Sequence, residues 1–532
     1  MDEIESVMHQ VGAAFAAGLT QPGSMEVSLI AHGHQSRTYD TAGDAARIGR
    51  WGAPGGPDLD GGLERLRVLA GAGGRLAVEL TGSPGGDYAV SCFAGGDGGG
   101  QFGLESVVVL DEDYRFPGHP RPGMPRPAGA ALDDRPTDAA VLADLRDLVA
   151  EFAAEHTRRR GVPPRFAPGR SEGEIRAAEE RLGFRLPEDV RALYRTIGDD
   201  DAEHGLLGCW HPAPLEQVVA WYHQQSPGSY GWDDGLFTDT PVVYETDPAG
   251  HVRRVSRSDW WVTFAPDHGL NYAALDLDPG PAGAAGQVIA YGRDVYGPVV
   301  YVAASVRQLI RDNLASMRAA AGDWTPEWPS APEHRWYADL GDADPAALVA
   351  AMTDPGAVQF AHLRRVDRVR LADLAGLPRL RTIKVLDVRS PAAYVDLRLA
   401  PGLPVEQVDV TAGHFEPERL ADAATLRYVR LAGNREPVRV AALAGRPDLV
   451  ALDLADAVVG DVAAVAAFPA LRVLTLNAGQ WRELFASGWE PARLAGARMG
   501  GRGGVAALGD WQRGLRPGGV RDTYRTVRRG RP

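Results

Sequence analysis

The spacing of apolar and polar positions divides the chain into segments with different predicted structures. From Ile4 to Phe15 the apolar residues fall at helical spacing, which predicts an amphipathic helix. Apolar and polar residues then alternate over Leu76–Leu80 and Tyr88–Cys92, on either side of a Pro-Gly turn, which predicts an antiparallel hairpin. A helix followed by antiparallel strands indicates a small α+β domain over residues 1–130.

A second pattern occupies residues 169–320. Ser171-x-x-Glu174 is a capping box, so a helix is expected to begin at about Glu172. Apolar runs over Asn271–Leu277 and Gln287–Tyr291 are separated by a Pro-Gly loop and read as two strands of one sheet. Helices on both sides of these strands predict a second α+β domain. A further hairpin is expected from Val242–Tyr244 and His251–Val255.

Beyond residue 345 one sequence phrase, apolar-x-x-apolar-x-apolar, occurs six times, and successive occurrences begin 21 to 25 residues apart. This is the period of leucine-rich repeats, and it predicts a stacked solenoid over residues 346–500. The residues that alternate with the repeated apolar positions would form an exposed strand face. Tyr428 and Arg430 on that face are candidates for binding a protein.

The remaining segments are predicted connections. Residues 131–168 contain a helix and a linker, and residues 321–345 are a Trp-, Pro- and Ala-rich linker. Residues 501–532 are a basic Gly/Arg-rich tail, which we expect to be disordered. The predicted fold class is therefore multidomain: an α+β N-terminal domain, a central α+β domain and a C-terminal leucine-rich-repeat solenoid.

Composition and charge narrow the function. With 45% hydrophobic and 24% charged residues the chain is of ordinary globular type. A formal net charge of -14 argues against general nucleic-acid binding, except through the basic tail. Two cysteines, Cys92 and Cys209, make no disulfide framework, and no apolar run reaches the roughly 18 residues of a membrane helix. We expect a cytoplasmic protein without a cofactor or membrane contact.

The central domain resembles a known superfamily. Trp261-x-x-Phe264-Ala265, Asp267, Asn271, Leu275–Gly280 and Gly286–Ile289 are similar to the core of the SUKH superfamily, with its fungal Smi/Knr cell-wall regulators and bacterial relatives. The resemblance implies an α+β binding module with no known catalytic activity. Its bacterial members look like immunity proteins that neutralise toxins.

The N-terminal domain is faintly similar to YezG-type immunity proteins. The similarity lies in the order of its elements and in the segment Asp111-x-x-Tyr114-Arg115-Phe116-Pro117.

Aromatic and acidic residues are the candidates for partner binding in the central domain. Aromatic side chains are favoured interface anchors, although most are core residues. An acidic loop could steer a basic partner, or be a solvated turn. The candidates are Trp232, Trp261, Phe264, Asp267, Tyr272, Asp276, Asp278, Asp199, Asp200 and Asp201.

Two sets of residues suggest chemistry. Asp276 and Asp278 could bind a cation or share acid–base duty, but Pro279-Gly280 breaks the pattern of a calcium loop. Histidines 204, 211 and 268 could join Cys209 around a metal. Only Cys209-x-His211 is closely spaced, however, so no metal is predicted.

We therefore expect a protein that binds another protein and is not an enzyme. The first hypothesis is an immunity protein that neutralises a toxin domain by stoichiometric binding. The alternative is a scaffold or regulator similar to the fungal proteins. A minor alternative is a metal-dependent enzyme that uses Asp276 and Asp278.

Overall fold

The computed structural model forms two compact units. The first comprises residues 1–114, 339–352 and 361–532, and the second residues 115–338 and 353–360. The residues described are 2–30, 33–40, 58–70, 75–95, 106–111, 113–119, 131–200, 203–224, 241–295, 297–322, 324–325, 335–341, 344–386, 388, 390, 392–501, 504–516 and 525–529. None of their helices has the length and apolar character needed to cross a membrane.

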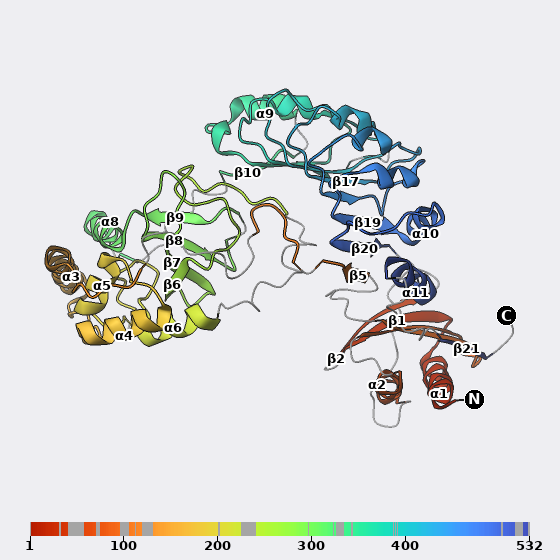
Figure 1. Ribbon diagram of the computed structural model, residues 1–532, viewed down its shortest axis with the longest axis horizontal. Helices are drawn as coiled ribbons and strands as arrows, with labels where there is room; N and C mark the ends of the chain where they lie inside the picture. Colours follow the sequence, from red (N-terminus) through yellow and green to blue (C-terminus); the bar gives the residue numbers. More distant parts are fainter. Residues whose placement is uncertain are drawn as a thin grey trace. The chain divides into compact units, whose positions relative to one another are not determined.

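The first unit begins with a five-stranded antiparallel sheet covered by helices. Its strand order is β2 (Gly33–Asp40), β1 (Gly23–Ile30), β3 (Arg75–Gly82), β4 (Tyr88–Gly95) and β21 (Arg525–Arg529). Helices α1 (Glu3–Gly18) and α2 (Leu59–Leu69) lie together beneath this sheet (Figure 1). The predicted opening helix and hairpin are both present, as α1 and β3–β4.

The C-terminal segment contradicts the expectation of a disordered tail. It contains helix α11 (Gly504–Leu515), and its last strand, β21, pairs antiparallel with β4. Val527 is only 8% exposed and belongs to the core that α1 and α2 cover. Arg525 pairs with Asp2 at the other end of the chain. One buried valine among arginines is too weak a pattern to predict a strand, and the pairing depends on residues over 400 positions away.

A second sheet fills the rest of the first unit. Its order is β10 (Tyr337–Asp339), β11 (Phe360–Arg364), β13 (Thr382–Leu386), β15 (Gln407–Thr411), β17 (Tyr428–Ala432), β18 (Ala451–Asp453), β19 (Val473–Asn477), β20 (Gly496–Gly500) and β5 (Ser106–Val109). From β13 to β20 all neighbouring strands are parallel. Each of the six repeated sequence phrases contains one strand of this sheet, and its central apolar residues are buried.

Short elements return the chain between these strands. They are β12 (Arg368–Arg370), β14 (Tyr394–Asp396), β16 (His414–Phe415), η1 (Pro355–Ala357), η2 (Leu371–Leu374), η3 (Pro417–Leu420), η4 (Ala441–Leu443), η5 (Val462–Ala467), α9 (Pro345–Ala351) and α10 (Ala478–Ala486). β12, β14 and β16 form a small parallel sheet of their own.

Strand β5 does not join the sheet of the predicted N-terminal domain. It pairs antiparallel with β20, so it closes the end of the repeat sheet. Asp111, just after β5, forms an ion pair with Arg472, whose guanidinium lies 4.5 Å from the ring centre of Tyr114. Strand β5, Asp111 and Tyr114 therefore belong with the repeat region, since they contact β20 and Arg472 there.

The second unit is built on a four-stranded antiparallel sheet. Its order is β6 (Trp261–Pro266), β7 (Asn271–Asp276), β8 (Gln287–Gly292) and β9 (Val300–Ala303). Its helices are α3 (Ala139–Arg160), α4 (Glu172–Leu182), α5 (Glu188–Thr196), α6 (Leu215–Gln224) and α8 (Val306–Ala319). Figure 1 shows α3, α5 and α8 gathered at one side of the sheet.

Local signals explain where these helices begin. The Ser171 hydroxyl accepts from the Glu174 backbone N–H at 3.2 Å, and the Glu174 carboxylate accepts from the Ser171 N–H at 2.8 Å, which confirms the capping box. Helix α3 was expected to precede a linker. Instead Leu145 and Phe152 are buried in the same core as α5 and the sheet, so α3 is part of this unit.

The expected hairpin of Val242–Tyr244 and His251–Val255 is absent, because both segments are described and neither is a strand. Their backbone groups have other partners. Val243 accepts from the Arg254 side chain, and His251 accepts from the Gly280 N–H at 2.9 Å. Val252 packs instead on Trp261, against the sheet face opposite the helices.

Candidate functional site

Two predicted aromatic anchors lie in the interior. Trp261 is 3% exposed and Phe264 is fully buried. Phe264 lies three positions after Trp261, so strand alternation places it in the helix-covered core, while Trp261 packs on the opposite sheet face. In this fold both residues pack the domain and do not form an open surface.

The other predicted aromatics differ. Tyr272 is half-buried, and its ring lies edge-on to Trp221 with centres 6.5 Å apart. It also lies 6.0 Å from the ring of Tyr291. Part of the Tyr272 side chain therefore stays exposed beside these two rings. Trp232 and Asp201 lie outside the described residues.

The two paired aspartates have separate structural partners. Asp276 is fully buried, and its carboxylate accepts from the Gln287 side-chain amide at 2.9 Å and from the Asp278 N–H at 3.1 Å. Burial raises the pKa of Asp276 from its ordinary 3.8 to about 6. Asp278 forms an ion pair with Arg253. These contacts fix the β7–β8 loop and give the two carboxylates different partners.

The buried Asp276 carboxyl makes stability depend on pH. Its folded pKa of about 6 lies above the unfolded value, so the folded state binds the proton more tightly and stability falls as pH rises from about 4 to 6. Relative to Asp276→Asn, which does not titrate, the wild type is expected to lose up to about 3 kcal/mol across that interval. Urea unfolding of both proteins at pH 4.5 and 7.5 measures the change. A difference between them that stays constant with pH would contradict it.

The tight turn between β6 and β7 is held by its own side chains. Asp267 accepts from the backbone N–H groups of Gly269 at 2.6 Å and Asn271 at 3.0 Å. The buried Asn271 amide donates to Asp267 at 2.8 Å and to Asp294 at 3.0 Å. The hydrogen bond from Asn271 holds the pKa of Asp294 below its usual range. Asp267 therefore shapes the turn, and residues 268 and 270 are presented at its tip.

A loop from another part of the chain lies beside this turn. The His211 N–H donates to the Pro266 carbonyl at 3.0 Å, and the Ala213 N–H donates to Phe264 at 2.9 Å. These bonds align residues 211–213 with the end of β6. We call the loop 203–211 and the turn 266–270 together the two-loop site.

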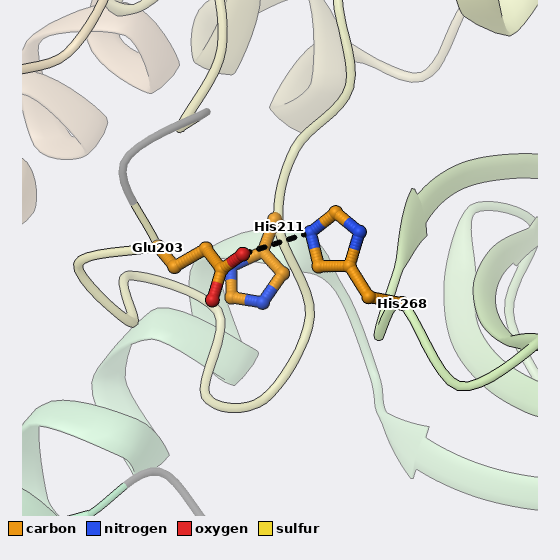
Figure 2. Close-up of side chains that lie close together, drawn as sticks. All are labelled: Glu203, His211 and His268. Carbon is orange, nitrogen blue, oxygen red and sulfur yellow. Dashed lines mark ion pairs between the residues drawn. The ribbon is translucent and has the colours of Figure 1, made fainter.

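Three titratable side chains meet in the two-loop site. One potential ligand atom each of Glu203, His211 and His268 lies within 4.8 Å of the other two. Figure 2 shows the Glu203 carboxylate facing His268, with the His211 ring beside both. The Glu203 and His268 side chains form an ion pair at 3.2 Å, and the two imidazole rings stack with centres 5.0 Å apart.

The backbone of the two-loop site is strained. Four non-glycine residues in the described part of the chain have positive φ, and three of them are here: Glu203 at 56°, His268 at 61° and Leu270 at 72°. Such conformations cost on the order of 1–3 kcal/mol each and cluster at functional sites. The observed strain therefore singles out this part of the domain.

Burial also sets the electrostatics of the site. Asp200 is fully buried, and burial raises the pKa of its carboxyl. Burial lowers the pKa of His211, whereas the charge of the nearby Glu203 raises it. Burial has the larger effect, so the His211 ring favours its neutral form. Burial also raises the pKa of the Cys209 thiol to about 12, which keeps it protonated and a poor nucleophile at neutral pH. Asp199, which also belongs to the predicted acidic loop, is half-buried.

The two candidates in the repeat sheet also have structural partners. Tyr428 is 4% exposed. The Arg430 guanidinium bridges neighbouring strands, with Asp409 at 3.0 Å and Asp456 at 3.1 Å. Tyr428 and Arg430 lie on the same face of β17, and of the two only the partly exposed Arg430 side chain is accessible there.

The sequence prediction missed Leu270. It placed Glu203 in the acidic loop with Asp199, Asp200 and Asp201 but did not group it with His211 and His268, which it dismissed as metal ligands because they are far apart in the chain. His211 and His268 are close together because residues 211–213 form hydrogen bonds with β6. The spacing of apolar residues along the sequence does not predict these hydrogen bonds. Leu270 did carry a local signal, as a lone leucine in the turn sequence Asp267-His268-Gly269-Leu270-Asn271.

Comparison with known proteins finds one family. Residues 169–312 match the SMI1 / KNR4 family (SUKH-1). The match begins just before α4 and ends within α8, so it includes the whole four-stranded sheet and the two-loop site. This finding supports the resemblance of the central domain to the SUKH superfamily. No curated protein matches the chain.

Proposed function

We propose that this protein is a cytoplasmic immunity-type protein that neutralises a toxin by stoichiometric binding and catalyses no reaction. The observation that carries the proposal is the SUKH-1 match over residues 169–312, a family consistent with protein-binding modules. The burial of Asp276 and its hydrogen bonds to neighbouring groups support the absence of catalysis by the paired aspartates.

The two-loop site is the part of this domain that we assign to the partner. Leu270 is 56% exposed, and its backbone has a positive φ, which is uncommon for a leucine. An apolar side chain on a rigid turn buries area on binding with little loss of entropy. The half-buried Tyr272 lies two residues away and adds an aromatic contact.

Charge around the site favours a basic partner. Glu203 and Asp294 are exposed, and the half-buried Asp267 is joined to Asp294 through the Asn271 amide. Together with the net charge of -14, these carboxylates would accelerate association with a cationic toxin surface and disfavour acidic competitors.

We infer that the repeat region, with its parallel strands from β13 to β20, is a leucine-rich-repeat solenoid. The support is the 21- to 25-residue spacing of the phrases, the parallel pairing and the 3₁₀ helices that return the chain. Its strand face, with Arg430, Asp409 and Asp453, would offer a second polar contact surface.

The proposal is tested by binding to the protein encoded by the neighbouring gene. We expect a one-to-one complex by size-exclusion chromatography with light scattering, and rescue of growth when both proteins are co-expressed. Leu270→Asp should weaken the complex at least about tenfold, because a charge replaces the central apolar contact. Aspartate tolerates positive φ, so the fold should be retained.

Leu132→Asp is the matched control, since Leu132 is 46% exposed and precedes α3, at the opposite end of this helix from His156, which contacts His204 of the two-loop site. It should leave the affinity unchanged. Equal losses in both variants would remove the two-loop site from the proposal. No complex and no rescue would reject the immunity function and favour the alternative of a regulator that binds a host protein.

A further inference from the structure

We propose that Glu203, His211 and His268 form a binding site for one divalent transition-metal ion of the zinc type. Two imidazoles and a carboxylate are a ligand set that zinc uses in proteins with an open coordination position. The three side chains come from two segments that the fold brings together (Figure 2).

The distances between the three ligand atoms suit a metal ion once the side chains move slightly closer together. Zinc holds its ligand atoms at about 2.0–2.1 Å, which places tetrahedral ligands about 3.3 Å from one another. The Glu203 and His268 atoms are already 3.2 Å apart, and no ligand atom of the three is more than 4.8 Å from another. Glu203 and His268 are exposed, so rotation of their side chains can supply the remaining movement.

The scaffold around the ligands is rigid. His211 is fastened to β6 through the Pro266 carbonyl, and the turn that carries His268 is held by Asp267 and Asn271. The positive φ angles of Glu203 and His268 turn both side chains toward His211 at the expense of backbone strain. An ion pair on the surface contributes too little to account for that strain.

Two further features favour a cation. The Nδ1 atom of His211 is buried with no hydrogen-bond partner among the described residues, and so is one carboxylate oxygen of Asp200. The charged groups that act on the His211 ring are Glu203, Asp200 and Asp267, besides His268. Three carboxylates around two imidazoles leave a local excess of negative charge that a divalent ion would balance.

The test uses the full-length protein alone, stripped of metal with EDTA and titrated with zinc chloride in a calorimeter. We expect saturable binding of one zinc ion per chain. His268→Asn and Glu203→Gln should each lower the affinity at least about tenfold, because each removes one of three ligands. Asparagine tolerates the positive φ of residue 268, and both positions are exposed, so the variants should fold.

His223→Asn is the matched control, because His223 is an exposed histidine of the same domain on α6, bonded to the Arg181 carbonyl. It should bind zinc like the wild type. Visible absorption of bound Co²⁺ gives a second readout, which should disappear in His268→Asn. No stoichiometric binding by the wild type, or equal binding by wild type and His268→Asn, would overturn the metal site. Since no partner is present, either result leaves the proposed binding function untouched.

Discussion

Replacing Glu179 by alanine is expected to lower the free energy of unfolding of the second unit by about 3–5 kcal/mol. Glu179 on α4 and Arg191 on α5 are 1% and 2% exposed, and they form a buried ion pair. The other Glu179 oxygen accepts from the Leu186 backbone N–H at 2.7 Å. The substitution removes both interactions and leaves a buried guanidinium short of a counter-charge.

The remaining partners of Arg191 cannot replace Glu179. Glu172 lies 2.7 Å away but is partly exposed, and Thr137 accepts a weaker hydrogen bond at 3.3 Å. Arg191 connects α5 to α4 and to the chain before α3. Loss of its buried counter-charge should therefore destabilise all three segments. Hydrogen exchange of α4 and α5 peptides in increasing urea measures the free energy for this unit separately.

An exposed pair on the same helix is the control. Arg176 and Glu180 lie 3.5 Å apart, with side chains 52% and 61% exposed. Glu180→Ala should therefore change the free energy of unfolding by less than about 1 kcal/mol. If the two substitutions lowered the free energy of unfolding by similar amounts, burial would not explain the contribution of the Glu179–Arg191 pair to stability.

Interactions between neighbours in the chain explain which parts of the fold were predictable. The Ser171 capping box needs only four residues, and both of its hydrogen bonds form. The repeated apolar phrase predicts strands because every repeat buries the same positions, and β13, β15 and β17 pair in one register. In both cases the signal and the structure span the same short stretch of sequence.

Long-range pairings explain what could not be predicted. Strand β21 forms only because β4 offers an unpaired edge, and β5 leaves its sequence neighbours to pair with β20. The two-loop site has the same origin, since His211 and His268 meet through the bonds of residues 211–213 to β6. Asp276 ends β7 and Asp278 lies in the loop after it, so the expected pair on one strand face does not form, and Asp276 is buried while Asp278 pairs with Arg253. The alternation of residues along a strand does not predict which face of the sheet a loop from elsewhere in the chain will bury.

Phe264→Ala is expected to lower the free energy of unfolding of the second unit by about 3–5 kcal/mol, because it opens a cavity in a core that packs too tightly to collapse fully. Phe264 is fully buried between the sheet and the helices and is surrounded by that core. Phe264→Leu keeps most of the apolar volume and should cost less than about 1.5 kcal/mol. Hydrogen exchange of β6 and β7 peptides measures both losses.

The same pair of variants separates packing from recognition. If Phe264 only packs the domain, Phe264→Leu should bind the partner of the two-loop site with unchanged affinity, since its side chain does not reach the surface. A variant that remains stable but loses affinity would show instead that Phe264 becomes uncovered on binding. That outcome would assign a direct contact to a residue that the free protein buries, and it would require β6 to move when the complex forms.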